Sequence, residues 1–127
     1  MPTLTRLLQA CVWIVCASVL GTLSLLPAGS IHRTTFGNHA EHAIAYAAAA
    51  FLVVLAQREH PSSRALVLLI LYAAAPEYLQ RFSPGRMPQM EDFLFSSLGI
   101  LIGGSAAWAF RRLRTAVKIL SASWATR

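Results

Sequence analysis

The sequence predicts an all-α integral membrane protein, a four-helix bundle, on three observations. The chain is 56% hydrophobic and 13% charged, which is too apolar for a soluble domain of 127 residues. Its apolar residues gather in four runs, at about residues 7–26, 40–57, 65–82 and 90–110. The junctions between these runs are short and contain proline and glycine, and no linker separates a second unit. We therefore expect one domain over residues 1–127.

Each run is long enough to cross a membrane. At about 1.5 Å per residue, a helix of roughly 20 residues spans a hydrocarbon core of about 30 Å. The first run exceeds the apolar region of a signal peptide, about 7–15 residues, and Leu26-Pro27-Ala28 is a poor cleavage site, so we expect an uncleaved anchor. The third contains Pro76, which removes one helical hydrogen bond. Pro84-Gly85 predicts a tight turn before the fourth apolar run. Pro88 suits the first turn of the helix that follows.

Cationic residues set the expected orientation, because short loops rich in lysine and arginine stay on the cytoplasmic side. One side collects Arg6, Arg58, Arg64, Arg111, Arg112, Arg114, Lys118 and Arg127, whereas the other has Arg33, Arg81 and Arg86. We therefore expect a multi-pass protein of the bacterial cytoplasmic (inner) membrane with both termini cytoplasmic. The net charge of +6 follows from this topology, and no base-stacking motif predicts nucleic acid as a partner.

Ionisable side chains from three different runs are predicted to meet in the outer half of the membrane. Glu77 lies thirteen residues past Arg64, about 20 Å from the cytoplasmic surface. His42 enters its run from the outer side, and Asp92 begins the fourth run. A buried carboxylate is costly unless it is paired or hydrated, so Glu77 should face the bundle interior, with Arg86, His42 or water as its partner. These positions predict a polar pocket.

Helical spacing adds further residues to this pocket. Asn38, His42 and Tyr46 follow one another at intervals of four, on one helix face, and Glu77 and Gln80 share a face. The predicted ligand-binding set is Asn38, His42, Tyr46, Glu77, Gln80, Arg86 and Asp92.

A stripe of small and polar residues runs down the fourth run. Asp92, Ser96, Gly99 and Gly103 follow at intervals of four, three and four, and Gly-x-x-x-Gly permits close helix contact. Four spans leave little room for a transport pathway in one copy. Transport would therefore require a homo-oligomer, for which Gly99 and Gly103 are the candidate surface.

Three pieces of the chain resemble the VanZ-like membrane proteins. They are Asn38-His39-x-x-His42-x-x-x-Tyr46, Glu77-x-x-Gln80-x-x-x-x-Gly85-Arg86 and Asp92-x-x-x-Ser96-x-x-Gly99-x-x-x-Gly103. The family commonly has Asp-Lys in place of Asn38-His39 and Asn in place of Ser96, so the resemblance is carried best by Glu77, Gln80, Arg86 and Asp92 and assigns no role to position 39. It implies a small helical bundle and an association with low-level resistance to the glycopeptide teicoplanin, but no catalytic residue.

The favoured function is binding of an anionic envelope lipid or a lipid-linked precursor. Arg86, His42 and Gln80 would hold the headgroup, since bidentate arginine suits phosphate, while Glu77 and Asp92 orient these donors. The expected partner is thus a membrane lipid.

Three alternatives remain open. A membrane-embedded enzyme acting on a lipid-linked phosphoryl or acyl group would use Glu77, His42 and Asp92 as catalytic residues, although no nucleophile elbow or phosphate loop is present. A structural protein would use Arg86 with Glu77 or Asp92 as an intramembrane ion pair. A metal could take His42, Glu77 and Asp92, with His39 or Glu41 as further donors. No short metal-ligand signature links these residues, so the sequence predicts neither a metal nor another cofactor.

Overall fold

The computed structural model describes residues 2–26, 37–57, 63–82, 87 and 89–125. These residues form helices α1 (Pro2–Leu25), α2 (Asn38–Ala56), α3 (Ser63–Leu79) and α4 (Met90–Ala125), with a 3-10 turn, η2 (Gln80–Phe82), continuing α3. The four helices are all long and apolar enough to cross a membrane. The predicted all-α membrane fold is therefore confirmed. The predicted junctions at residues 27–30, 60–62 and 83–86, together with Pro88, lie outside the described residues.

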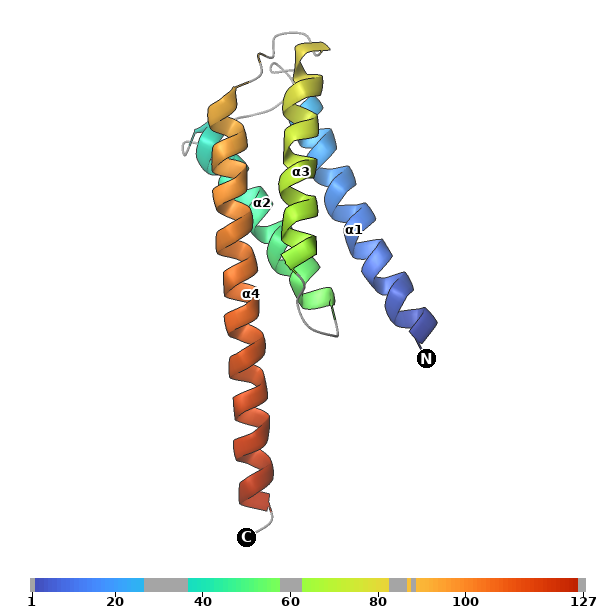
Figure 1. Cartoon of the computed structure of the whole chain (residues 1–127), viewed down its shortest axis with the longest axis vertical. Coiled ribbons are helices and arrows are strands. Elements are labelled where there is room, and N and C mark those ends of the chain that lie inside the picture. The colour runs from blue at the N-terminus through green and yellow to red at the C-terminus, as the bar shows by residue number, and fades with distance from the viewer. Residues whose placement is uncertain (1, 27–36, 58–62, 83–86, 88, 126–127) are drawn as a thin grey trace.

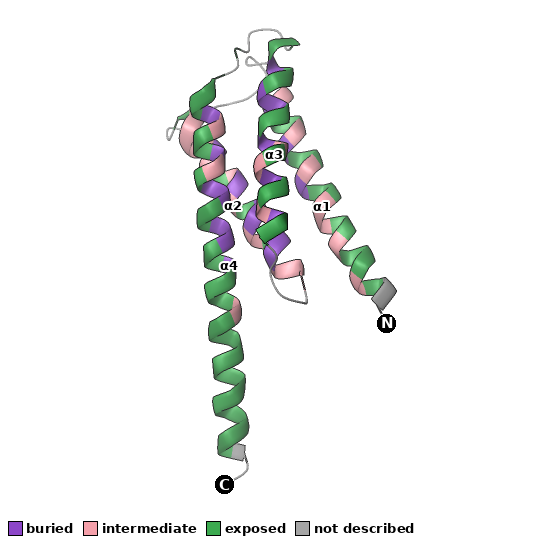
Figure 2. Cartoon of the chain, viewed as in Figure 1, coloured by how far each residue is buried: buried purple, intermediate pink, exposed green. Residues whose placement is uncertain are grey.

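Consecutive helices run in opposite directions, as Figure 1 shows. The helices α1 and α3 end, and α2 and α4 begin, at one end of the bundle, which we call the upper end as it is drawn there. The helix α4 continues far below the lower ends of α2 and α3. We expected the fourth span to cover residues 90–110, and the helix continues to Ala125 because residues 111–125 contain no proline or glycine and include good helix formers. Residues 112–124 of this extension are exposed (Figure 2).

The main packing contact joins α2 to α4, and two glycines make it close. A Cβ atom placed on Gly99 would lie 2.2 Å from the carbonyl oxygen of Ala43, and one on Gly103 would lie 2.0 Å from that of Ala47. Close contact at the predicted glycine stripe is thus confirmed. Within one chain this stripe packs against α2, and its role between two copies stays a prediction.

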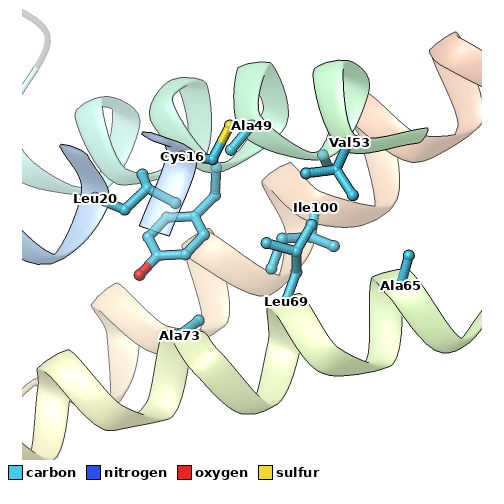
Figure 3. Close-up of a cluster of buried hydrophobic side chains, with 10 residues drawn as sticks. Cys16, Leu20, Ala49, Val53, Ala65, Leu69, Ala73 and Ile100 are labelled. Carbon is cyan, nitrogen blue, oxygen red and sulfur yellow. The ribbon is translucent and has the colours of Figure 1, made fainter. Parts of the chain in front are cut away.

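A core of small and aliphatic residues joins all four helices below the upper end (Figure 3). It comprises Cys16, Leu20, Tyr46, Ala49, Ala50, Val53, Ala65, Leu69, Ala73 and Ile100. The helix α1 is further held by the Tyr72 hydroxyl of α3, which donates a hydrogen bond to the carbonyl of Ala17. Large apolar side chains such as Ile44, Leu71 and Leu101 point outward, as lipid-facing residues do.

Arg111 of α4 donates hydrogen bonds to the C-terminal end of α2, at the lower end of that helix. The Arg111 guanidinium donates hydrogen bonds to the carbonyls of Gln57 and Val54, the latter at 3.1 Å. The Val54 carbonyl also accepts a hydrogen bond of 3.3 Å from the backbone N–H of Gln57. Carbonyls at a helix C-terminus lack helical partners, so Arg111 chiefly supplies a donor to the carbonyl of Gln57. A hollow of about 530 Å³ lies beside this contact, and Arg114 and Lys118 line it with Arg111.

Candidate functional site

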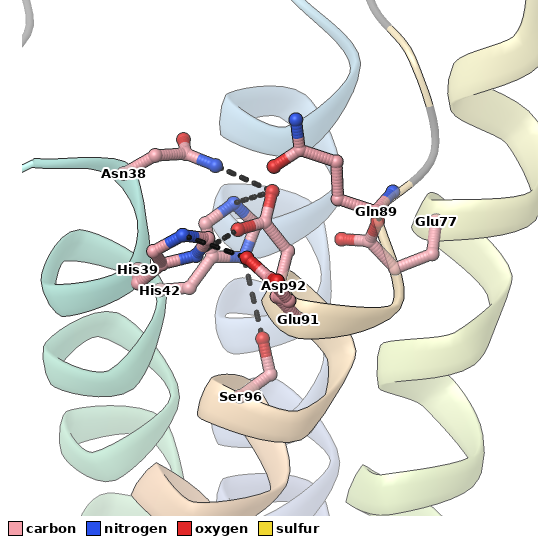
Figure 4. Close-up of polar contacts among 8 residues, drawn as sticks. All are labelled: Asn38, His39, His42, Glu77, Gln89, Glu91, Asp92 and Ser96. Carbon is pink, nitrogen blue, oxygen red and sulfur yellow. Dashed lines mark hydrogen bonds and ion pairs between the residues drawn. The ribbon is translucent and has the colours of Figure 1, made fainter.

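Three ionisable side chains converge at the upper end of the bundle, each from a different helix. His42 of α2, Glu77 of α3 and Asp92 of α4 each offer one nitrogen or oxygen atom, and these atoms lie within 4.8 Å of one another (Figure 4). All three residues are buried. The predicted meeting of these three helices is therefore confirmed, while the roles assigned to the residues stay predictions. We call these three residues the polar trio.

Asp92 is the centre of the hydrogen bonding in this region. It lies in the first turn of α4, where a carboxylate is stabilised by the helix dipole. Its Oδ2 accepts a hydrogen bond from the side-chain amide of Asn38, and its Oδ1 lies 2.9 Å from Nδ1 of His39. Both partners belong to the first turn of α2. Asp92 therefore links the beginnings of the two most closely packed helices.

His42 is oriented by the next turn of α4. Its Nδ1 lies 3.2 Å from the Ser96 hydroxyl oxygen, and its Nε2 lies 3.7 Å from Oδ2 of Asp92. Because Asp92 and Ser96 are four residues apart, they lie on one face of α4 and meet opposite edges of the imidazole. The buried Tyr46 ring lies nearly parallel to this imidazole, with 6.4 Å between the ring centroids.

His39, which the sequence analysis considered only as a further metal donor, makes a contact with Asp92 that was not predicted. Its Nδ1 contacts Asp92, its Nε2 lies 3.2 Å from a carboxylate oxygen of Glu91, and its ring stacks on Phe95 with centroids 4.9 Å apart. The family resemblance left a role for position 39 in doubt, and these contacts place His39 at the edge of the site. The spacing to His42 is the signal that could have found it, since residues three apart share a helix face.

Glu77 reaches the polar trio from the last turn of α3. Its Oε2 accepts a hydrogen bond of 3.4 Å from the backbone nitrogen of Gln89, just before α4. Gln80, which follows in η2, is 1% exposed, and its amide nitrogen has no hydrogen-bond partner in the described part of the chain. Arg86, the expected partner of Glu77, lies outside the described residues.

Two carboxylates and an imidazole in a buried position can serve two kinds of chemistry. They can move protons, or they can hold a cation. Asn38 and His39 contact Asp92 at this site, and the buried amide of Gln80 lies in the turn that follows Glu77. The side chain of Asp92 is 3% exposed, whereas that of His39 is 39% exposed. The site is therefore buried at Asp92 and open to solvent at His39, and we call the side of the site at His39 the wet rim.

Comparison with known proteins identifies the family. The family model described as VanZ/LLP1 matches residues 7–111, which include most of α1, all of α2 and α3, the first part of α4 and the whole polar trio. The comparisons with curated proteins and with solved structures gave no match. The match covers most of the 127 residues, which is enough to assign the family. The chain belongs to the VanZ/LLP1 family of proteins.

Proposed function

We propose that the upper end of the bundle binds the headgroup of an anionic envelope lipid or of a lipid-linked precursor. The observation that carries this proposal is the amide of Gln80, which is buried and finds no acceptor within the residues that the structure describes. A buried donor without an acceptor costs about 1–3 kcal/mol, so such groups in proteins normally meet a ligand or water. A phosphate or carbonyl oxygen of a headgroup would supply the acceptor.

The exposure of the surrounding side chains supports entry from the membrane surface. His39 lies at the wet rim, where its two ring nitrogens face Asp92 and Glu91. Asp92 also holds Asn38 in place, and the amide of Asn38 has a second N–H that could meet an anion. Arg86, which the sequence places beside this site, would add a bidentate contact to a phosphate. In this proposal the carboxylates do not touch the anion but hold its donors in position.

The distribution of lysine and arginine indicates the side of the membrane on which this lipid binding would take place. With both termini in the cytoplasm of a bacterial cell, the upper end would face the outer side of the cytoplasmic membrane. A lipid-linked envelope precursor exposed on that side could then enter the site laterally from the bilayer.

Native mass spectrometry of the detergent-extracted chain tests the proposal. We expect a copurified anionic lipid in the wild type and about tenfold less of it in Gln80→Leu, because the donor is lost while the apolar volume is kept. Gln89→Leu is the matched control, since Gln89 is exposed. Equal lipid in Gln80→Leu and in the wild type, with both folded, would contradict the proposal.

The same preparation distinguishes binding from catalysis. The wild type and Glu77→Gln are incubated with a lipid-linked precursor, and the lipid is analysed afterwards. Binding predicts unchanged precursor in both. A product that forms with the wild type and not with Glu77→Gln would show instead that the chain is an enzyme acting on the lipid-linked group.

Glycopeptide resistance is the cellular consequence that we propose for this binding. Expression of the chain in a teicoplanin-sensitive bacterium should raise the inhibitory concentration of teicoplanin, and Gln80→Leu should reduce that increase. An unchanged inhibitory concentration with a normal amount of protein in the membrane would separate the lipid-binding proposal from resistance.

A further inference from the structure

We propose that His42, Glu77 and Asp92 form a binding site for one divalent first-row metal ion, with Zn²⁺ as the best fit. Each residue comes from a different helix, so the ion would join α2, α3 and α4 at the upper end. This inference does not depend on lipid binding, since it rests on the geometry and the donor chemistry of the polar trio.

The distances among the donor atoms are close to those of a metal site. Zinc binds imidazole nitrogen and carboxylate oxygen at about 2.0–2.2 Å, which puts neighbouring ligand atoms of a tetrahedral site about 3.4 Å apart. His42 Nε2 and Asp92 Oδ2 are 3.7 Å apart, and all three donor atoms lie within 4.8 Å of one another. Side-chain rotation of Glu77, without a change in the helices, would complete the set.

The neighbours of the polar trio are those that a metal site requires. A histidine ligand usually donates its second ring N–H to a neighbouring oxygen, which sets the tautomer and the ring orientation. Here Nδ1 of His42 faces the Ser96 hydroxyl at 3.2 Å, and in the tautomer with the proton on Nδ1 the lone pair of Nε2 would point toward Asp92 and the ion. The Asp92 carboxylate is held in turn by Asn38 and His39.

The charges also balance. As metal ligands, two carboxylates and a neutral imidazole carry a charge of −2, which matches the charge of a divalent ion. The ion and its ligands would thus form a neutral set, which costs less to bury than a charged one. One nitrogen and two oxygen donors favour Zn²⁺, Mn²⁺ or Fe²⁺, since Mg²⁺ and Ca²⁺ prefer oxygen alone.

Three protein ligands would leave one coordination position of a tetrahedral ion for water or a substrate oxygen. That position would have a route to the surface at the His39 rim, where the side chain is 39% exposed. The site therefore resembles metal centres that bind a further group more than closed structural ones, which have four protein ligands.

Zinc titration of the full chain in detergent micelles, after treatment with a chelator, tests the proposal. We expect uptake of about one Zn²⁺ per chain in the wild type, by calorimetry and elemental analysis. Glu77→Gln, Asp92→Asn and His42→Gln should bind at least about tenfold more weakly, and Ser96→Ala about 10–100-fold more weakly through its effect on His42. Glu91→Gln is the matched control for Glu77→Gln and should bind like the wild type, because the Glu91 side chain is 72% exposed.

Two measurements keep the test decisive if a variant fails to fold. A wild-type chain that takes up no Zn²⁺ and no Mn²⁺ would overturn the proposal, whatever the variants do. Uptake by Arg86→Ala but not by the wild type would also overturn it, because the Arg86 guanidinium would then occupy the carboxylates in the native chain.

Failure of the metal site and failure of the proposed function can be told apart. Wild-type uptake of Zn²⁺ without copurified lipid would support the metal site and contradict lipid binding. Gln80→Leu separates the two in the other direction, since it should lose lipid and still take up Zn²⁺ like the wild type.

Discussion

Nδ1 of His42 lies 3.2 Å from the hydroxyl oxygen of Ser96, across the interface between α2 and α4. Both residues are buried, so this hydrogen bond is made away from the surface of the bundle. It ties the orientation of one imidazole to the face of α4 that also carries Asp92. Two adjacent serines in α4 allow its contribution to be measured.

Ser96→Ala should lower the free energy of unfolding by about 1 kcal/mol, because it removes one hydrogen bond between two helices. Ser97→Ala is the matched control. The Ser97 hydroxyl is buried and has no hydrogen-bond partner in the described part of the chain, so its removal should be neutral or slightly stabilising. Denaturant unfolding of both variants in micelles makes the comparison. Equal decreases in the free energy of unfolding of the two variants would contradict a stabilising hydrogen bond between Ser96 and His42.

Asp92→Asn should destabilise the chain by about 2 kcal/mol, because the new amide group would face the donors of Asn38 or His39 instead of accepting from both. Glu91→Gln, one residue away and exposed, should change the free energy of unfolding by less than about 0.5 kcal/mol. Thermal unfolding without added metal measures both. If Asp92→Asn were as stable as the wild type, Asp92 would not be the centre of this hydrogen bonding.

Gly99→Ala and Gly103→Ala should each destabilise the bundle by about 1–3 kcal/mol or more, since each new methyl group would overlap a backbone carbonyl of α2. Gly104→Ala should cost less. A Cβ there would lie 2.7 Å from a terminal methyl carbon of Leu66, and that flexible side chain can move aside. Unfolding in micelles gives the order of the three variants.

The same glycine variants test the location of this contact. Because the stripe packs against α2 of the same chain, light scattering should give the same oligomeric state for Gly99→Ala and the wild type. A wild-type dimer that dissociates in Gly99→Ala would show that the stripe also joins copies.

Arg111→Ala should lower the free energy of unfolding by about 1–3 kcal/mol, since it removes the donor that the carbonyls of Val54 and Gln57 share. Arg112→Ala is the control. That guanidinium lies 3.6 Å from the centre of the Trp108 ring on the exposed face of α4, and contacts of this kind contribute about 0.5–1 kcal/mol. Hydrogen exchange at the end of α2 should rise in Arg111→Ala and stay unchanged in Arg112→Ala.

The sequence by itself determined the fold class, the four apolar spans of the described residues and the common level of the ionisable groups along the bundle. Hydrophobicity over about 20 residues is a local property, and a membrane leaves a long apolar segment few structures other than a helix. The rise of a helix is constant, so His42, Glu77 and Asp92 could be placed at one level without knowing how their helices pack.

Only the tertiary structure decided which faces of the helices meet. The glycine stripe indicated a close contact, but its partner, the backbone of α2 at Ala43 and Ala47, depends on how the helices pack. The contact of His39 with Asp92 depends on the rotation of α2 about its axis, as does that of Ser96 with His42. Rotation and crossing angle are set by the packing of many side chains at once, and no local stretch of sequence contains that information.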